Sequence, residues 1–81
     1  MTQPDPLAAA ASVKRTTALL RDARSVQHRL DVLMATALAM EDASMPRIAE
    51  ARGAVERLVT ELTFREQTQH RQARQAVRRL R

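Results

Sequence analysis

Two histidines are the side chains of this sequence best suited to proton transfer or metal binding near neutral pH. They are His28 and His70, and histidine is the residue type that changes charge in that range. Catalytic groups and metal ligands must converge on one point. No cysteine exists in the chain and no group of carboxylates adjoins either histidine. The sequence therefore predicts neither a metal site nor a catalytic histidine.

The acidic residues do not form a recognisable catalytic set either. No spacing isolates a pair of them in an apolar setting, which paired-carboxylate chemistry requires. The residues considered are Asp31, Glu41, Asp42, Glu50, Glu56 and Glu61. A phosphate-binding loop is excluded because the chain has one glycine, and no serine or cysteine nucleophile motif is present. We expect a protein that is not an enzyme, with no cofactor and no small-molecule substrate.

Arginine is the remaining residue type whose distribution could indicate a binding site. The net charge of +5 comes from residues 65–81, which hold six arginines and one glutamate, since residues 1–64 hold eight basic and eight acidic side chains. In a helix, spacings of three and four place four of these arginines on one side, with Arg79 beside them: Arg71, Arg74, Arg78 and Arg81. Such a stripe can bind phosphates of a nucleic acid. The alternative is a solvated helix end, where cations complement the helix dipole.

The elements that position these side chains are predicted to be helices. The chain of 81 residues has fifteen alanines, one glycine and no asparagine, and Phe64 is its one aromatic residue. Strands favour β-branched and aromatic residues, and hairpin turns favour Gly and Asn. The composition predicts an all-α protein.

Helix-breaking residues divide the chain into two helices of similar length. Asp5 followed by Pro6 is typical of a helix start, and Pro46 marks a break and a new start. We predict an antiparallel two-helix hairpin forming a single domain. Its expected parts are a loose tail at 1–4, a helix at about 6–43, a turn at about 43–46, a helix at about 47–79 and a basic end at 65–81.

Apolar residues repeat at spacings of three and four in both helices, which is typical of a coiled-coil seam. In the first helix the row is Leu19, Ala23, Val26, Leu30, Leu33, Ala37 and Met40. In the second helix it is Ile48, Ala51, Val55, Leu58 and Leu62, with Val59 and Phe64 beside it. A turn centred near 44.5 would place residue i opposite residue 89 minus i. Leu33 is then expected to meet Val55, and Val26 to meet Leu62.

The first helix has more apolar residues than one partner helix can cover. In the expected register, residues 65–72 of the second helix are all polar and lie opposite the Leu19 level. A chain this short also forms a marginal core, and disulfides are excluded. We therefore expect a homodimer or a protein partner to cover these residues: Val13, Leu19, Leu20, Met34 and Leu38.

The function that fits these expectations is protein–protein interaction, as in an adaptor, an assembly factor or a small chaperone. In size and build the chain is similar to the small helical-hairpin chaperones of bacterial secretion machines, although it shares no motif with them. We expect no membrane span and a cytoplasmic protein, because cysteine is absent. The alternative is a small basic regulator that binds nucleic acid through its arginine-rich end.

Overall fold

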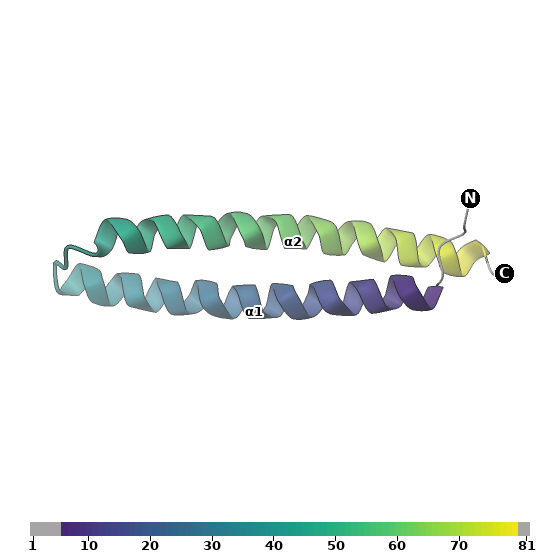
Figure 1. Ribbon diagram of the computed structural model, residues 1–81, viewed down its shortest axis with the longest axis horizontal. Helices are drawn as coiled ribbons and strands as arrows, with labels where there is room; N and C mark the ends of the chain where they lie inside the picture. Colours follow the sequence, from purple (N-terminus) through teal and green to yellow (C-terminus); the bar gives the residue numbers. More distant parts are fainter. Residues whose placement is uncertain (1–5, 80–81) are drawn as a thin grey trace.

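The chain folds as two long antiparallel helices, in a computed structural model that describes residues 6–79. Helix α1 spans Pro6–Ala39 and helix α2 spans Met45–Arg79. They lie side by side over their whole length, with the two chain ends together at the end opposite the turn (Figure 1). The molecule is 60 Å long and 18 Å by 13 Å across. The predicted all-α antiparallel hairpin is confirmed, whereas the expected tail at 1–4 lies outside the described residues.

Local sequence explains where the helices begin. Proline opens α1 at Pro6, where its missing amide costs nothing because the first helical amides have no intrahelical partner. Ser44 precedes α2, and its carbonyl accepts the first helical hydrogen bond, from the Ile48 amide at 3.1 Å. Gly53 lies inside α2 without a positive φ angle. Glycine at this position makes the helix less stable by about 1 kcal/mol than alanine would.

The end of α1 is set by backbone hydrogen bonding around Glu41. This residue has a φ angle of 52°, in the left-handed region. The Glu41 amide donates to the Leu38 carbonyl at 3.1 Å, and the Asp42 amide donates to the Ala37 carbonyl at 2.9 Å. These two bonds form a Schellman motif, which usually has glycine at the left-handed position. Helix α1 therefore ends four residues before the end expected from Pro46.

Asp42 ties this helix end to the start of α2. Its Oδ1 accepts a hydrogen bond from the Ser44 amide at 2.8 Å. Hydrogen bonds from the Ser44 side chain and backbone hold the pKa of Asp42 below its ordinary value. The connection at residues 40–44 is thus held by bonds within itself, and it begins three residues earlier in the chain than the turn expected at about 43–46.

The position of the connection fixes the register of the hairpin. Side chains pair across the helices at Thr17 with Glu66, and at Asp31 with Arg52. Both pairs place residue i of α1 level with residue 83 minus i of α2. The expected value of 89 was wrong, because the left-handed turn at Glu41 reverses the chain earlier than Pro46 would. The shift of six residues moves one helix by about 9 Å relative to the other.

The new register also changes which residues form the core. Leu20, Ala23 and Leu62 pack together, with Val59 against them. Leu19, Val26, Leu33 and Met40, which were expected in the seam, are 44–69% exposed. The buried apolar residues of the described chain are Leu20, Ala23, Ala37, Ile48, Leu62 and Ala76. Half of them are alanines, so the core between the two helices is thin.

The polar second half of α2 is accommodated by polar and small residues of α1. Residues 65–72 lie level with residues 11–18, not with Leu19 and Leu20 as expected. The Thr17 hydroxyl donates to a carboxylate oxygen of Glu66 at 2.7 Å, and Thr16 beside it is buried. A buried or half-buried polar group is stable when it has a hydrogen-bond partner. The register therefore matches polar residues with polar residues.

The left-handed turn can be tested by replacing Glu41 with glycine. Glu41→Gly should raise the free energy of unfolding by roughly 0.5–1 kcal/mol, because glycine adopts positive φ without a steric penalty. The same substitution inside α2, Glu50→Gly, should lower it by about 1 kcal/mol. Urea unfolding of both variants at one protein concentration, followed by circular dichroism, measures the two effects. A loss of stability for Glu41→Gly would contradict the turn geometry.

Candidate interaction surface

The seam, where the two helices pack together, is formed by a regular set of residues in each helix. In α1 the seam residues recur every three or four positions and are buried or half-buried: Val13, Thr16, Leu20, Ala23, Gln27, Leu30, Met34 and Ala37. The corresponding buried or half-buried residues of α2 are Ile48, Val55, Val59, Leu62, Glu66, Gln69, Ala73 and Ala76. A residue's position relative to this seam determines the side of the hairpin on which it lies.

One side of the hairpin carries a row of large apolar residues. Leu19, Val26, Leu33 and Met40 each follow a seam residue by three positions and are spaced by seven. Helical geometry turns each of them roughly 90° away from the direction of α2. Leu58 has the same place relative to Val55 in α2 and therefore lies on the same side, level with Val26. We call these five residues the apolar face.

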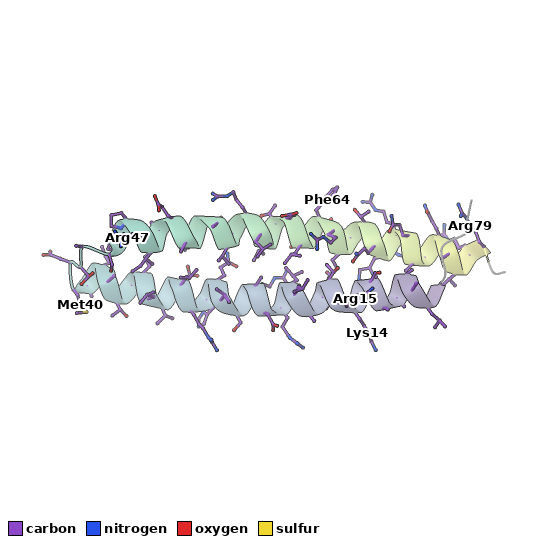
Figure 2. All side chains as sticks on the ribbon, viewed as in Figure 1. Lys14, Arg15, Met40, Arg47, Phe64 and Arg79 are labelled. Atoms are coloured by element: carbon purple, nitrogen blue, oxygen red, sulfur yellow. The ribbon has the colours of Figure 1, made fainter. Side chains whose placement is uncertain are left out.

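The members of the apolar face are well exposed in the hairpin. Leu19 is 54% exposed, Leu33 is 49% exposed and Met40 is 69% exposed. Figure 2 shows Met40 at the turn end of the hairpin with its side chain directed away from α2. From Leu19 to Met40 the row extends about 32 Å along the helix. A continuous apolar row of this length on a soluble surface is typical of a binding site.

The other side of the hairpin is polar over most of its length. Residues that follow the seam by one position lie there, and most are charged or hydrogen-bonding: Thr17, Arg24, Asp31, Glu56, Thr63 and His70. The hydrogen bond from Thr17 to Glu66 and the ion pair between Asp31 and Arg52 both involve this side. The two sides of the hairpin therefore differ sharply in chemistry.

The residues expected at a partner surface fall into two groups. Leu19 and Leu38 are exposed, Leu38 at 64%. Val13 and Met34 are half-buried on the seam, and Leu20 is buried there at 2% exposure. The seam position of Leu20 follows from the register, because Leu62 and Val59 cover it. The surface missed by sequence reasoning is the set Val26, Leu33, Met40 and Leu58. The spacing of seven among Val26, Leu33 and Met40 was the available signal, whereas Leu58 follows only from the register.

Three of the arginines from the predicted basic stripe come together at the open end of the hairpin. Arg71, Arg74 and Arg78 line one shallow depression with Gln75, and all three are exposed. Arg79 lines a different hollow, which shares Gln75 with this depression, and Arg81 lies outside the described residues. The spacing argument therefore holds for three arginines, which can offer several guanidinium groups to one anionic partner.

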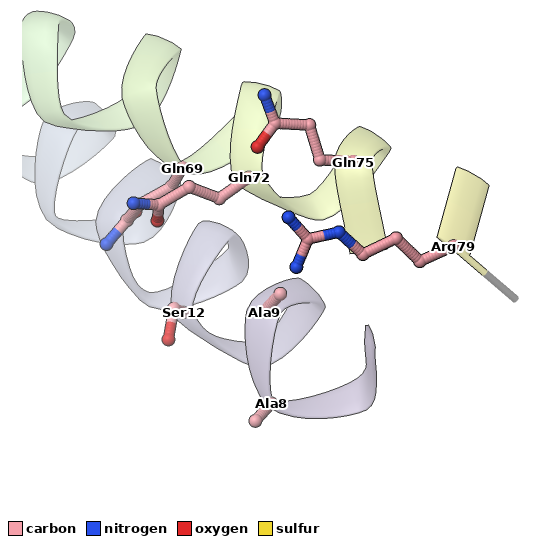
Figure 3. Close-up of a pocket in the computed structure, with 7 residues that line it drawn as sticks. All are labelled: Ala8, Ala9, Ser12, Gln69, Gln72, Gln75 and Arg79. Carbon is pink, nitrogen blue, oxygen red and sulfur yellow. The ribbon is translucent and has the colours of Figure 1, made fainter. Parts of the chain in front are cut away.

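Arg79 lines a second hollow between the start of α1 and the last turns of α2. This shallow pocket of about 360 Å³ is lined by Ala8, Ala9, Ser12, Gln69, Gln72, Gln75 and Arg79. Figure 3 shows the Arg79 guanidinium above Ala9, with the glutamine side chains along α2. Gln69 is half-buried, and within residues 6–79 its Oε1 is buried without a hydrogen-bond partner.

The residues considered for catalysis or metal binding stay apart. His28 and His70 are exposed, and the register separates them by roughly 22 Å along the hairpin. Within residues 6–79 no group of three His, Asp or Glu side chains is placed to hold a metal ion. Asp31 is the carboxylate that forms an interhelical ion pair, with Arg52. Its geometry is that of a structural contact.

Comparisons with known proteins do not place this chain in a family. No family model, no curated protein and no solved structure matches it. Neither of the two described helices has an apolar stretch long enough to cross a membrane. The surfaces described above are therefore interpreted from their chemistry alone.

The unpaired Gln69 oxygen gives a test of packing at the open end of the seam. Gln69→Leu should raise the free energy of unfolding by about 1 kcal/mol, because it removes a buried acceptor without a partner and adds apolar contact near Val13. Gln67→Leu, at an exposed position of the same helix, should change it by less than about 0.5 kcal/mol. Thermal unfolding of the two variants separates these outcomes, and equal effects would contradict the seam position of Gln69.

Proposed function

We propose that this protein is a non-enzymatic protein–protein interaction module of the cytoplasm, such as an adaptor, an assembly factor or a small chaperone. Its working surface is the apolar face. The observation that carries the proposal is the row of Leu19, Val26, Leu33 and Met40, exposed at every seventh position on the side of α1 that α2 does not cover. Heptad spacing of large apolar residues is the pattern that binds another helix.

The thin core of the hairpin supports the same proposal. The buried large apolar side chains of the described chain are Leu20, Ile48 and Leu62. Helices gain most of their stability from packing, and a two-helix hairpin of this size has little of it. Covering the apolar face would add a second layer of contacts. Binding a partner is therefore expected to stabilise the fold as well as to occupy the surface.

A second candidate function, nucleic-acid binding, is favoured by one observation. Arg71, Arg74 and Arg78 share an exposed depression with Gln75 at the open end. Guanidinium groups bind phosphate well, and such binding weakens steeply as salt concentration rises. The net charge of +5 belongs to this end of the chain. We rank it second because the basic cluster is short.

The proposal is tested by capture of partners with a tagged chain from a lysate of the source organism, with and without nuclease. Leu19→Asp/Leu33→Asp should lose the captured protein, because two charges would be desolvated in the interface. The matched variant, Arg71→Gln/Arg74→Gln/Arg78→Gln, should retain it. Circular dichroism of both variants checks that they remain helical.

The opposite pattern would replace the proposal with the second candidate. In that case the arginine variant loses binding, nuclease removes the captured material, and affinity for a labelled DNA duplex falls with rising salt. Capture unchanged by both variants would show that neither surface is the working one.

A further inference from the structure

We infer that the apolar face binds the same face of a second copy of this chain, with the two hairpins antiparallel and a two-fold axis at the level of Val26 and Leu58. This inference rests on the proposed function and identifies the partner. Its starting point is that α1 carries its row of exposed large apolar residues on one side of the hairpin, whereas the other side is mostly polar. When two copies bury the same side against each other, no apolar side is left for a third copy. The assembly is therefore a dimer and not an open array.

The surface area of the hairpin leaves room for such a dimer. The chain exposes 6613 Å², whereas a compact monomer of 9.1 kDa exposes about 4900 Å². The excess of about 1700 Å² exceeds the roughly 800 Å² per partner that an interface of standard size buries. Two stacked hairpins make a four-helix bundle, which covers one side of each helix pair.

The part of the apolar row from Leu19 to Leu33 is self-complementary about Val26, whereas Met40 would lie level with Ser12 of the other copy. In an antiparallel pair of α1 helices with Val26 on the axis, Leu19 of one copy meets Leu33 of the other. Leu58 of α2 lies at the level of Val26 and meets its own symmetry mate. Each apolar residue near the axis therefore packs against an apolar residue. An axis midway between Val26 and Leu33 would also pair apolar residues of the row, but it would bring Arg29 of the two copies together and take Leu58 off the axis.

Charges beside the row select the antiparallel arrangement. Asp22 and Arg29 lie seven residues apart on the outer edge of α1, and both are exposed. The antiparallel axis at Val26 places Asp22 of each copy next to Arg29 of the other. A parallel pairing of α1 helices would instead place each charge next to its own copy. Opposite charges across an interface set its orientation.

The remaining two-fold arrangement, with both turns at one end, fits less well. It stacks α1 of one copy on α2 of the other at the same level of the hairpin. Leu19 then lies level with Arg65, and Asp22 lies level with Glu61. The first contact places an apolar side chain against a charge and the second brings two carboxylates together. Like charges across an interface select against this orientation.

The first experiment measures the mass of the full chain by sedimentation over a dilution series. The expected mass is twice 9.1 kDa, and Leu33→Asp should shift it towards that of one chain. Val32→Asp, two residues after the seam residue Leu30 and therefore on the side of α1 opposite α2, should leave it doubled. A wild-type mass of one chain at every concentration up to about 100 µM, which corresponds to a binding free energy weaker than about −5.5 kcal/mol, would overturn the inference.

Cysteine cross-linking then tests the orientation, since the chain has no cysteine of its own. Under mild oxidation, Val26→Cys should cross-link to itself, and Val32→Cys should not, because a disulfide forms only when the Cα atoms are within about 7 Å. Leu19→Cys and Leu33→Cys should cross-link when mixed but not alone, because identical positions would be about 21 Å apart. Self-cross-linking of Leu19→Cys would overturn the antiparallel arrangement.

A charge exchange provides a readout in variants that keep the apolar face intact. Asp22→Arg and Arg29→Asp should each weaken the dimer, by roughly two- to fivefold at low salt, as expected for exposed ion pairs. The double variant Asp22→Arg/Arg29→Asp should restore it, because the exchanged charges still oppose each other across the antiparallel axis. Absence of rescue would count against this pairing.

The outcomes separate this inference from the proposed function. A single-chain mass together with protein capture that depends on Leu19 and Leu33 would remove the second copy as the partner and leave the interaction module standing. If Leu19→Asp/Leu33→Asp changes neither the mass of the protein nor the captured partners, both the dimer and the proposed function are contradicted. Recovery of the untagged chain itself as the captured protein supports both.

Discussion

The left-handed turn at Glu41 is the constraint on which the rest of this structure depends. It ends α1 at Ala39 through two backbone hydrogen bonds, and it thereby sets which residues of the two helices lie level. Two helices can cover only one side of each other. Because the register decides that side, a local backbone conformation at the turn determines both the core and the surface that remains exposed.

The register leaves the hairpin with two unlike sides. On one side Thr17 is bonded to Glu66, and Asp31 is paired with Arg52. On the other side Leu19, Val26 and Leu33 are exposed together. Polar contacts between exposed groups contribute little to stability, whereas burying large apolar side chains contributes about 1.5–3 kcal/mol each. Burying the apolar side therefore offers more stabilisation than burying the polar side. For this reason the apolar side is the one expected to bind another molecule.

The fold class followed from the sequence, but the register did not. An alanine-rich chain with Pro46 as its internal breaker predicts two antiparallel helices, and the structure has them. In α1, however, Ala23, Leu30 and Ala37 are flanked by apolar residues on both sides, so periodicity is compatible with two seams. One of them contains Leu20 and Met34, and the other contains Val26 and Leu33. The choice was made by Glu41, whose residue type gives no signal for a left-handed turn.

The exposed apolar row overlaps only in part with the residues expected from the sequence at a partner surface. The expectation of uncovered apolar residues on α1 came from counting them, and this count does not depend on register. Leu19 belongs to the face in both views, whereas Leu20 lies in the core. The basic end shows a similar division, since spacing brought Arg71, Arg74 and Arg78 together but could not show that Arg79 lies in a different hollow.

A methyl nuclear Overhauser experiment on the native chain tests the register of the two helices most directly, because it reports which side chains are in contact between them. Cross-peaks from Ala23 and Leu20 to Val59 and Leu62 are the predicted result, because these residues pack together in the core. Cross-peaks from Val26 to Leu62 and from Leu33 to Val55 would contradict it. They would place the apolar face inside the hairpin and leave no such surface for a partner.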